Sequence, residues 1–157
     1  VFHAKLVYAM LAAFVLGYLV EVAGVASGLL FGEYQYGKPL GWKLFDVPLI
    51  IGVNWLILSF SSLGIVGRFI SNSFIKVVFA SLLMVLLDVL IEPVAIELDF
   101  WTWTQEDVPF QNYIMWFFLA ILINSIVSVF LREINYKTSL FVFLAQIYFF
   151  LFLNIIL

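Results

Sequence analysis

Three acidic residues lie inside long apolar stretches of this sequence, where a charged side chain is unusual. They are Glu21, Asp88 and Glu92, and the last two are one helical turn apart on the same face of a helix. An ionised carboxylate at the centre of a bilayer costs roughly 2.5–3.5 kcal/mol on insertion scales. We therefore expect each acid to face the interior of a helical bundle and to hold its proton there. A protonated acid in a dry apolar pocket can serve as a general acid, so these three are the candidate catalytic residues.

The same acids also have a purely structural interpretation. Intramembrane acids often tie helices together by accepting hydrogen bonds from polar neighbours. The candidate donors inside the apolar stretches are Asn54, Asn112, Asn124, Trp55 and Trp116. However, Gly17, Gly24 and Gly28 share a helical face with Glu21, and small residues there let another helix or a flat ligand come close. Three acids together with a glycine-lined face favour a functional site.

The sequence around the acids follows one pattern twice. Thirteen residues after a buried acid comes a pair of aromatic residues with one residue between them, then Asp-Val-Pro, then a tryptophan seven residues beyond the proline. In order, the two copies are Glu21, Tyr34, Tyr36, Asp46-Val47-Pro48 and Trp55, and then Asp88, Trp101, Trp103, Asp107-Val108-Pro109 and Trp116. We interpret residues 21–55 and 88–116 as an internal repeat that forms two related helical hairpins.

Composition restricts the class of protein. The chain has 157 residues, of which 66% are hydrophobic and only 11% are charged, more apolar surface than a soluble domain of this size can bury. There is no cysteine and one histidine, which argues against disulfides, thiolate nucleophiles and metal centres built from these residues. The net charge is −3, with no basic patch typical of a nucleic-acid-binding protein. We expect an integral membrane protein without a metal or cofactor.

Five apolar stretches are long enough to cross a ~30 Å hydrocarbon core as helices. They cover residues 6–31, 48–66, 74–98, 109–131 and 138–157. Pro48 and Pro109 suit the first turn of a helix, with Asp46 and Asp107 as N-caps, and Pro93 should kink its helix. The expected fold is an all-α integral membrane protein with about five transmembrane helices. These form two related parallel hairpins plus a C-terminal helix, in a single transmembrane domain over residues 1–157.

The basic residues are distributed unevenly between the predicted loops. One side carries Lys38 and Lys43, and the other carries Lys5, Arg68, Lys76, Arg132 and Lys137. The positive-inside rule then places the short basic turns in the cytoplasm and both Asp-Val-Pro loops outside, in a multi-pass protein of the cell membrane. Glu21 and Asp88 each lie ten residues before the predicted end of their helix, ~15 Å below the outer side. Glu97 and Glu106 are expected to be solvated.

Ordered motifs in both halves resemble one known family. The first half contains Glu21-Val-Ala-Gly24-Val-Ala-Ser-Gly28-Leu-Leu-Phe31-Gly32-Glu-Tyr34-Gln-Tyr36, then Leu40-Gly41, Val47-Pro48 and Trp55. The second half contains Asp88, Glu92-Pro93-Val-Ala, Trp101-Thr-Trp103, Val108-Pro109, Asn112-Tyr113 and Trp116. Over roughly residues 17 to 125 the chain resembles the membrane carotenoid-biosynthesis family that includes the bisanhydrobacterioruberin and carotenoid 1,2-hydratases. It departs from that pattern in having Glu92 where Asp is expected before Pro93.

The resemblance implies a hydro-lyase that hydrates a terminal carbon–carbon double bond of a long acyclic carotenoid, or of another isoprenoid lipid. Asp88 or Glu21 would protonate the alkene, and Glu92 would steer water or stabilise charge. The residues expected to contact the substrate are Tyr34, Tyr36, Trp55, Trp101, Trp103, Asn112 and Trp116. The four aromatic residues of the loops also have a simpler interpretation as anchors at the membrane–water interface.

Three other functions fit the same residues. A carotenoid cyclase or isomerase would begin with the same protonation but would add no water. A non-catalytic subunit would bind a carotenoid or lipid, with membrane protein partners or as a homo-oligomer. A proton-coupled transporter would also use buried acids and a duplicated hairpin.

Overall fold

Five helices account for most of the chain in the computed structural model, which describes residues 2–105 and 107–157. They are α1 (Phe2–Ser27), α2 (Leu49–Val66), α3 (Ser73–Glu97), α4 (Phe110–Phe130) and α5 (Tyr136–Ile156). Within the described residues, these five are long and apolar enough to cross a membrane. The predicted all-α membrane fold is therefore confirmed. Glu106, which was expected to be solvated, lies outside the described residues.

Helix α1 ends four residues earlier than predicted. Gly28 adopts a left-handed backbone conformation, with φ +65°, and its N–H donates to the Gly24 carbonyl at 2.8 Å. A residue in this conformation ends an α-helix, and glycine adopts it without steric cost. The apolar residues that follow, up to Phe31, belong to the loop, although Phe31 itself is buried.

The predicted aspartate caps are wrong. Helices α2 and α4 begin at Leu49 and Phe110, so their N-caps are Pro48 and Pro109, neither of which provides a side-chain hydrogen bond. Asp46 lies two residues before its cap, in a tight turn with φ 62°, and Asp107 is likewise two residues before Pro109. Asparagines cap the other two helices that follow turns. Asn72 and Asn135 accept hydrogen bonds from backbone N–H groups three residues later.

Two short β-ladders, which the sequence analysis did not predict, close one end of the bundle. Strands β1 (Tyr34–Tyr36) and β4 (Trp101–Trp103) pair antiparallel, with Gln35 opposite Thr102. Strands β2 (Lys43–Leu44) and β3 (Val47–Pro48) form a hairpin beside them. An aromatic residue at every second position places both aromatic side chains of a strand on one face, and this spacing was the signal for β1 and β4.

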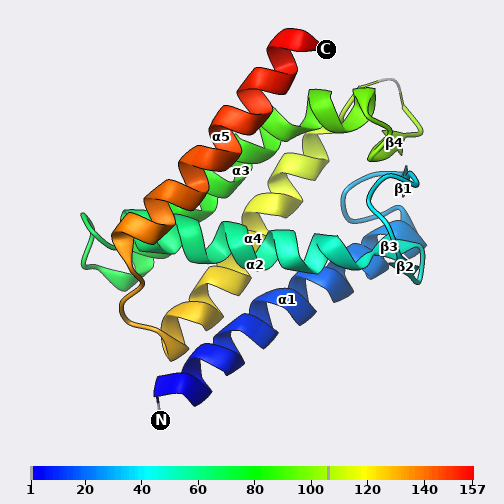
Figure 1. Ribbon diagram of the computed structural model, residues 1–157. Helices are drawn as coiled ribbons and strands as arrows, with labels where there is room; N and C mark the ends of the chain where they lie inside the picture. Colours follow the sequence, from blue (N-terminus) through cyan, green and yellow to red (C-terminus); the bar gives the residue numbers. More distant parts are fainter. Residues whose placement is uncertain (1, 106) are drawn as a thin grey trace.

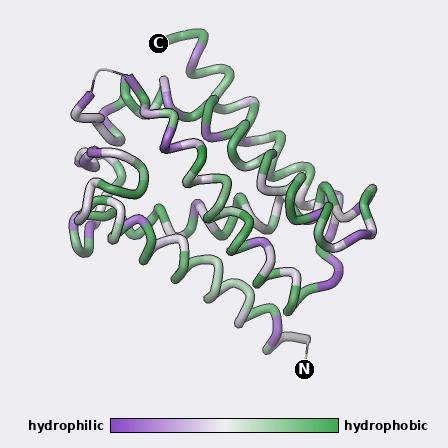
Figure 2. Tube along the Cα trace, turned by 180° about the vertical axis from the view of Figure 1, so that it is seen from behind, coloured by the Kyte–Doolittle hydropathy of each residue, from purple (hydrophilic) through white to green (hydrophobic). Residues whose placement is uncertain are grey.

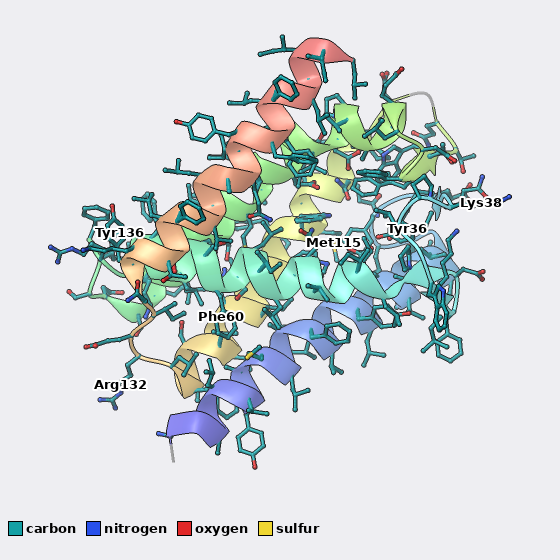
Figure 3. The ribbon with its side chains drawn as sticks, in the orientation of Figure 1. Tyr36, Lys38, Phe60, Met115, Arg132 and Tyr136 are labelled. Carbon is teal, nitrogen blue, oxygen red and sulfur yellow. The ribbon has the colours of Figure 1, made fainter. Side chains whose placement is uncertain are left out.

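The molecule has two distinct ends (Figure 1). One end carries all four strands and the C-terminus, and we call it the strand end. The other carries the N-terminus and the α2–α3 and α4–α5 turns, and we call it the turn end. Tyr36 and Lys38 lie at the strand end and Arg132 and Tyr136 at the turn end (Figure 3). Apolar residues dominate the helices between the two ends, whereas polar residues gather in the loops (Figure 2).

The helices bury a mixed core and expose apolar surface to the sides. Asn124 is fully buried and links three helices, because it accepts from the Ser59 hydroxyl at 2.6 Å and donates to Ser81 Oγ at 3.0 Å. Its hydrogen-bond partners are therefore two serines and the Met84 sulfur rather than the buried acids. Large side chains on α5 face outward, among them Phe141 and Ile155, which are 76% and 82% exposed. Such a surface suits a lipid environment and would be costly in water.

Candidate functional site

Glu21 is the centre of the first half of the site. Its carboxyl is 3% exposed and accepts three hydrogen bonds. Oε2 accepts from the hydroxyls of Tyr34 and Tyr36 at 2.6 and 2.9 Å, and Oε1 accepts from the Trp55 indole N–H at 3.1 Å. Gly17, one turn earlier on α1, makes room for this indole, since a Cβ at Gly17 would overlap the Trp55 side chain. The acid thus joins α1, the ladder and α2.

Glu92 is the centre of the second half. It is also 3% exposed, and its Oε2 accepts from the indole N–H groups of Trp101 and Trp103 at 3.0 and 3.1 Å. The Asn112 amide donates to Glu92 Oε1 and to Asp88 Oδ2, both at 3.1 Å, and so bridges the two acids of α3. The other oxygen of Asp88, Oδ1, is buried and has no hydrogen-bond partner among the described residues.

Aromatic rings join the two halves. Trp55 of α2 and Trp116 of α4 lie with ring centroids 4.3 Å apart. Across the ladder, Tyr34 faces Trp103 at 5.0 Å and Tyr36 meets Trp101 edge to face at 6.0 Å. Separations of this size are typical of attractive aromatic pairs. Each half of the site therefore packs directly against the other.

A small cavity lies between the halves. Its volume is about 30 Å³, and its lining residues are Glu21, Tyr34, Tyr36, Ile51, Asn54, Glu92, Trp101, Trp103, Asn112 and Trp116. A water molecule needs roughly 10–15 Å³ of such space and several polar partners. At this size the cavity has room for one or two waters beside two carboxyl groups, and the end of an isoprenoid chain needs more.

Two phenols in the wall of the cavity stay protonated. Burial raises the pKa of Tyr34, and the nearby Glu21 carboxyl raises it further. The pKa of Tyr36 is raised well above its usual value, first by burial and then by Glu21. A phenol with a raised pKa remains neutral at physiological pH, so both hydroxyls can donate to Glu21 or accept from it.

Most of the predicted site residues lie around this cavity. Of the ten, eight line it directly, and Trp55 contacts it through Glu21 and Trp116. Asp88 is the exception, because it is fully buried behind Asn112 and does not reach the cavity. The cavity also includes two residues outside the prediction, Ile51 and Asn54. Asn54 was considered in the sequence as a candidate donor to the buried acids, but it was not predicted as a site residue.

The acids that match in position are Glu21 and Glu92, rather than Glu21 and Asp88. Glu21 lies six residues before the end of α1 because that helix ends at Ser27. Glu92 lies five residues before the end of α3, and Asp88 lies nine before it. At about 1.5 Å per residue, Glu21 and Glu92 are each ~8–9 Å from the strand end of their helices. The predicted depth of ten residues for Glu21 is therefore wrong.

Fold and site together define a multi-pass α-helical membrane protein with a small, acid-lined cavity near the strand end of its helices. A comparison with protein families agrees with that class, because the profile described as carotenoid biosynthesis protein matches residues 1–157. The chain belongs to this carotenoid biosynthesis family.

One curated relative has a named activity. The chain is 26% identical over 121 residues to bisanhydrobacterioruberin hydratase of Haloarcula japonica. The match covers 69% of this chain and 40% of the relative, so this chain spans less than half of that protein's length. No solved structure matches the chain significantly.

Proposed function

We propose that this protein is a carotenoid-modifying membrane enzyme that adds water to a terminal double bond of an acyclic carotenoid. The family membership and the hydratase relative support the substrate class. The observation that supports the reaction is the presence of both Glu21 and Glu92 in the lining of one water-sized cavity. Acid-catalysed hydration needs these components: a proton donor, a site for water and a group that stabilises positive charge.

Glu21 is the proposed proton donor. Two of its three hydrogen-bond partners are hydroxyls, Tyr34 and Tyr36, which can accept a hydrogen bond as well as donate one. A protonated Glu21 therefore keeps good partners in its neutral form. Asp88 was an equal candidate in the sequence, but its burial outside the cavity separates it from any substrate.

Glu92 is the proposed carboxylate that stabilises the cation. The indole N–H groups of Trp101 and Trp103 can only donate, and the bridging amide N–H of Asn112 does the same. Among the described residues all three partners donate, and this supports a proposed carboxylate form of Glu92 in place of the protonated form expected from the sequence. The neighbouring indole faces add attraction for a cation by the cation–π effect.

The proposed catalytic cycle consists of three proton transfers and one addition. The Glu21 O–H bond breaks and a C–H bond forms at the less substituted alkene carbon, leaving a tertiary cation. Water in the cavity attacks this cation and loses a proton to Glu92, which gives the tertiary alcohol. The proton then returns to Glu21 through water in the cavity. One water is added in total and no electron is transferred, so the reaction requires no redox cofactor.

Asp88 and Asn112 are proposed to position Glu92 rather than to act on the substrate. Asn112 bridges both acids, so its amide fixes the rotamer of Glu92. Substrate entry requires movement, because the cavity of about 30 Å³ is smaller than the reacting end of a carotenoid. The aromatic pairs across the ladder are the groups that must separate.

The proposal is tested in a host that accumulates acyclic carotenoids. Extracted pigments are separated by chromatography with mass detection, with folded protein verified in the membrane. A new pigment heavier by one water is expected for the wild type, with the yield reduced about 10²- to 10⁴-fold in Glu21→Gln and Glu92→Gln, the range typical of general acid–base catalysis. Glu97→Gln is the matched control, because Glu97 is an exposed acid at the end of α3.

Two other outcomes would contradict hydration. A new pigment of unchanged mass would indicate a cyclase or isomerase that shares the protonation step. No new pigment from folded protein would favour a carotenoid-binding subunit that acts with another protein. If both Glu21→Gln and Glu92→Gln kept full activity, neither acid would have a role in the reaction.

A further inference from the structure

A second cavity lies at the turn end, away from the acid site. Its volume is about 300 Å³, and it is bordered by the ends of α2 and α4, the beginnings of α3 and α5, and the turns between them. The lining residues that carry charge are Arg68, Lys76, Arg132 and Glu133. Three basic residues against one acidic residue give the walls a net charge of +2 at neutral pH, which favours an anion.

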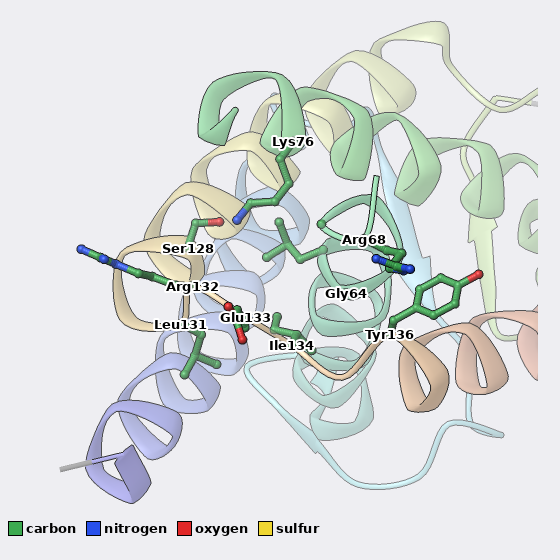
Figure 4. Close-up of a pocket in the computed structure, with 11 residues that line it drawn as sticks. Gly64, Arg68, Lys76, Ser128, Leu131, Arg132, Glu133, Ile134 and Tyr136 are labelled. Atoms are coloured by element: carbon green, nitrogen blue, oxygen red, sulfur yellow. The ribbon is translucent and has the colours of Figure 1, made fainter. Parts of the chain in front are cut away.

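Two polar side chains extend into this cavity from opposite helices. Lys76 of α3 is 9% exposed, an unusual degree of burial for a lysine. Ser128 of α4 has a buried hydroxyl with no hydrogen-bond partner among the described residues. Figure 4 shows the Lys76 ammonium and the Ser128 hydroxyl directed toward one another, with Arg68 and Arg132 at the rim. A buried donor without a partner is costly, so an acceptor bound between the two would stabilise both.

Two apolar grooves adjoin the cavity, and each shares one lining residue with it. Ile134 is shared with a groove of about 450 Å³ between α1, α2 and α5, which includes Leu56 and Phe60. Ser128 is shared with a groove of about 250 Å³ between α3 and α4, which includes Phe74 and Val129. The helices that form both grooves are membrane-spanning, so the grooves face the hydrocarbon region.

We propose that this cavity binds the phosphate of an anionic phospholipid, with one acyl chain in each flanking groove. Lys76 and Ser128 donate to the phosphate oxygens, and Arg68 and Arg132 meet the headgroup at the rim. The net positive wall selects an anionic headgroup over a zwitterionic one. The paired grooves favour a lipid with two acyl chains over free phosphate, although both ligands carry the phosphate group that Lys76 and Ser128 bind. This site is separate from the acid cavity and does not depend on the proposed reaction.

Native mass spectrometry of the detergent-purified chain tests the proposal. The protein is offered an equal mixture of phosphatidylglycerol and phosphatidylcholine of matched chain length. One phosphatidylglycerol per chain is expected to be retained, and Lys76→Gln should weaken retention about tenfold, because hydrogen bonds to charged groups are the strong ones. Lys38→Gln is the matched control, since it removes the same charge at the strand end.

Further variants keep the result decisive. Arg68→Gln changes an exposed rim residue, so it reports on the site even if Lys76→Gln does not fold. Ser125→Trp fills the α3–α4 groove and should weaken lipid retention while leaving the basic side chains of the cavity unchanged. The proposed lipid site would be contradicted if the protein retained phosphatidylglycerol and phosphatidylcholine equally. It would also be contradicted if Lys38→Gln reduced lipid retention as much as Lys76→Gln does. A different result would assign the cavity to free phosphate and contradict lipid binding. In that case excess inorganic phosphate would displace the lipid, and Ser125→Trp would have no effect on lipid retention.

Discussion

At the scale of single residues, the donors around each carboxyl distinguish acids that look alike in the sequence. Glu21 is surrounded by hydroxyls that donate and accept, whereas Glu92 is surrounded by N–H groups that only donate. Among the described residues, Asp88 has one donor on one oxygen and none on the other. Three buried acids within two helices can therefore have three different roles.

Asp88→Asn should separate positioning from catalysis. If Asp88 only holds Asn112, the amide variant keeps most of the contact, and we expect the hydration rate to fall less than tenfold. Glu92→Asp, which shortens the side chain by one methylene, should retain more activity than Glu92→Gln because it keeps the charge. Pigment yields from equal amounts of membrane protein give both comparisons. A loss in Asp88→Asn as large as in Glu92→Gln would make Asp88 a direct participant.

The buried phenols should make the fold sensitive to alkaline pH. The pKa values of Tyr34 and Tyr36 are raised in the folded chain, so the unfolded chain loses these protons first, from about pH 10 upward. Their contribution to stability is thus complete below pH 10 and is lost as the pH rises further. Unfolding in detergent, followed by circular dichroism over alkaline pH, should show a shallower decline for the Tyr34→Phe, Tyr36→Phe double variant. Tyr8→Phe, at an exposed site on α1, is the control; an unchanged slope in the double variant would contradict this explanation.

At the scale of elements, the helices were predictable and the strands were not. Each helix is a long apolar stretch, and hydropathy alone identifies it. The β1–β4 ladder pairs residues 65 to 69 positions apart through backbone groups, and no local pattern specifies such a pairing. The alternation of aromatic residues was visible, but it was read as an interfacial anchor because membrane proteins commonly have aromatic belts. The end of α1 was missed because apolar residues continue past Gly28.

Gly37→Ala should open the ladder without affecting the helices. A Cβ at Gly37 would overlap the backbone carbonyl of Asp99, so the strand ends must move apart. We expect a destabilisation of about 1–3 kcal/mol, the usual cost of forced overlap in a packed region. The emission spectrum of Trp101 and Trp103 should shift to the red as they gain access to water. Gln35→Ala is the control in the same ladder, because Gln35 is exposed; a similar shift there would show that the effect is not specific to the overlap.

At the scale of the whole molecule, polar contacts at different depths hold the helices together. The cluster of Asn124 with Ser59 and Ser81, which we call the Asn124 cluster, joins α2, α3 and α4 below the acid site. Within the site, Asn112 joins α4 to α3 through its hydrogen bonds to Asp88 and Glu92. Buried polar contacts between membrane helices contribute about 0.6–2 kcal/mol each. The sequence predicted that such residues would be buried, but their pairing depends on helix rotation, which hydropathy does not specify.

Asn124→Leu should therefore reduce stability without removing the acid site. The variant leaves the Ser59 and Ser81 hydroxyls without their shared partner, and we expect a loss of about 1–2 kcal/mol. Thermal unfolding in detergent measures this loss, and pigment analysis at low temperature should still show product. Ser125→Leu on an exposed face of α4 is the control. Unchanged stability in Asn124→Leu would mean that the cluster contributes nothing net.

The β1–β4 ladder has a consequence for how the protein can be encoded. Glu21, both tyrosines and Trp55 precede the α2–α3 turn, whereas Glu92, both ladder tryptophans and Trp116 follow it. The part of the chain before this turn and the part after it each contribute only some of the residues that line the cavity. They pair through strands β1 and β4 and through the contact between the Trp55 and Trp116 rings. If the coding sequence is cut between the codons for Ile70 and Ser71 and the two parts are expressed together, the two fragments should therefore assemble in the membrane and co-purify. Either fragment expressed alone should be cleared by proteases, as an orphan subunit would be.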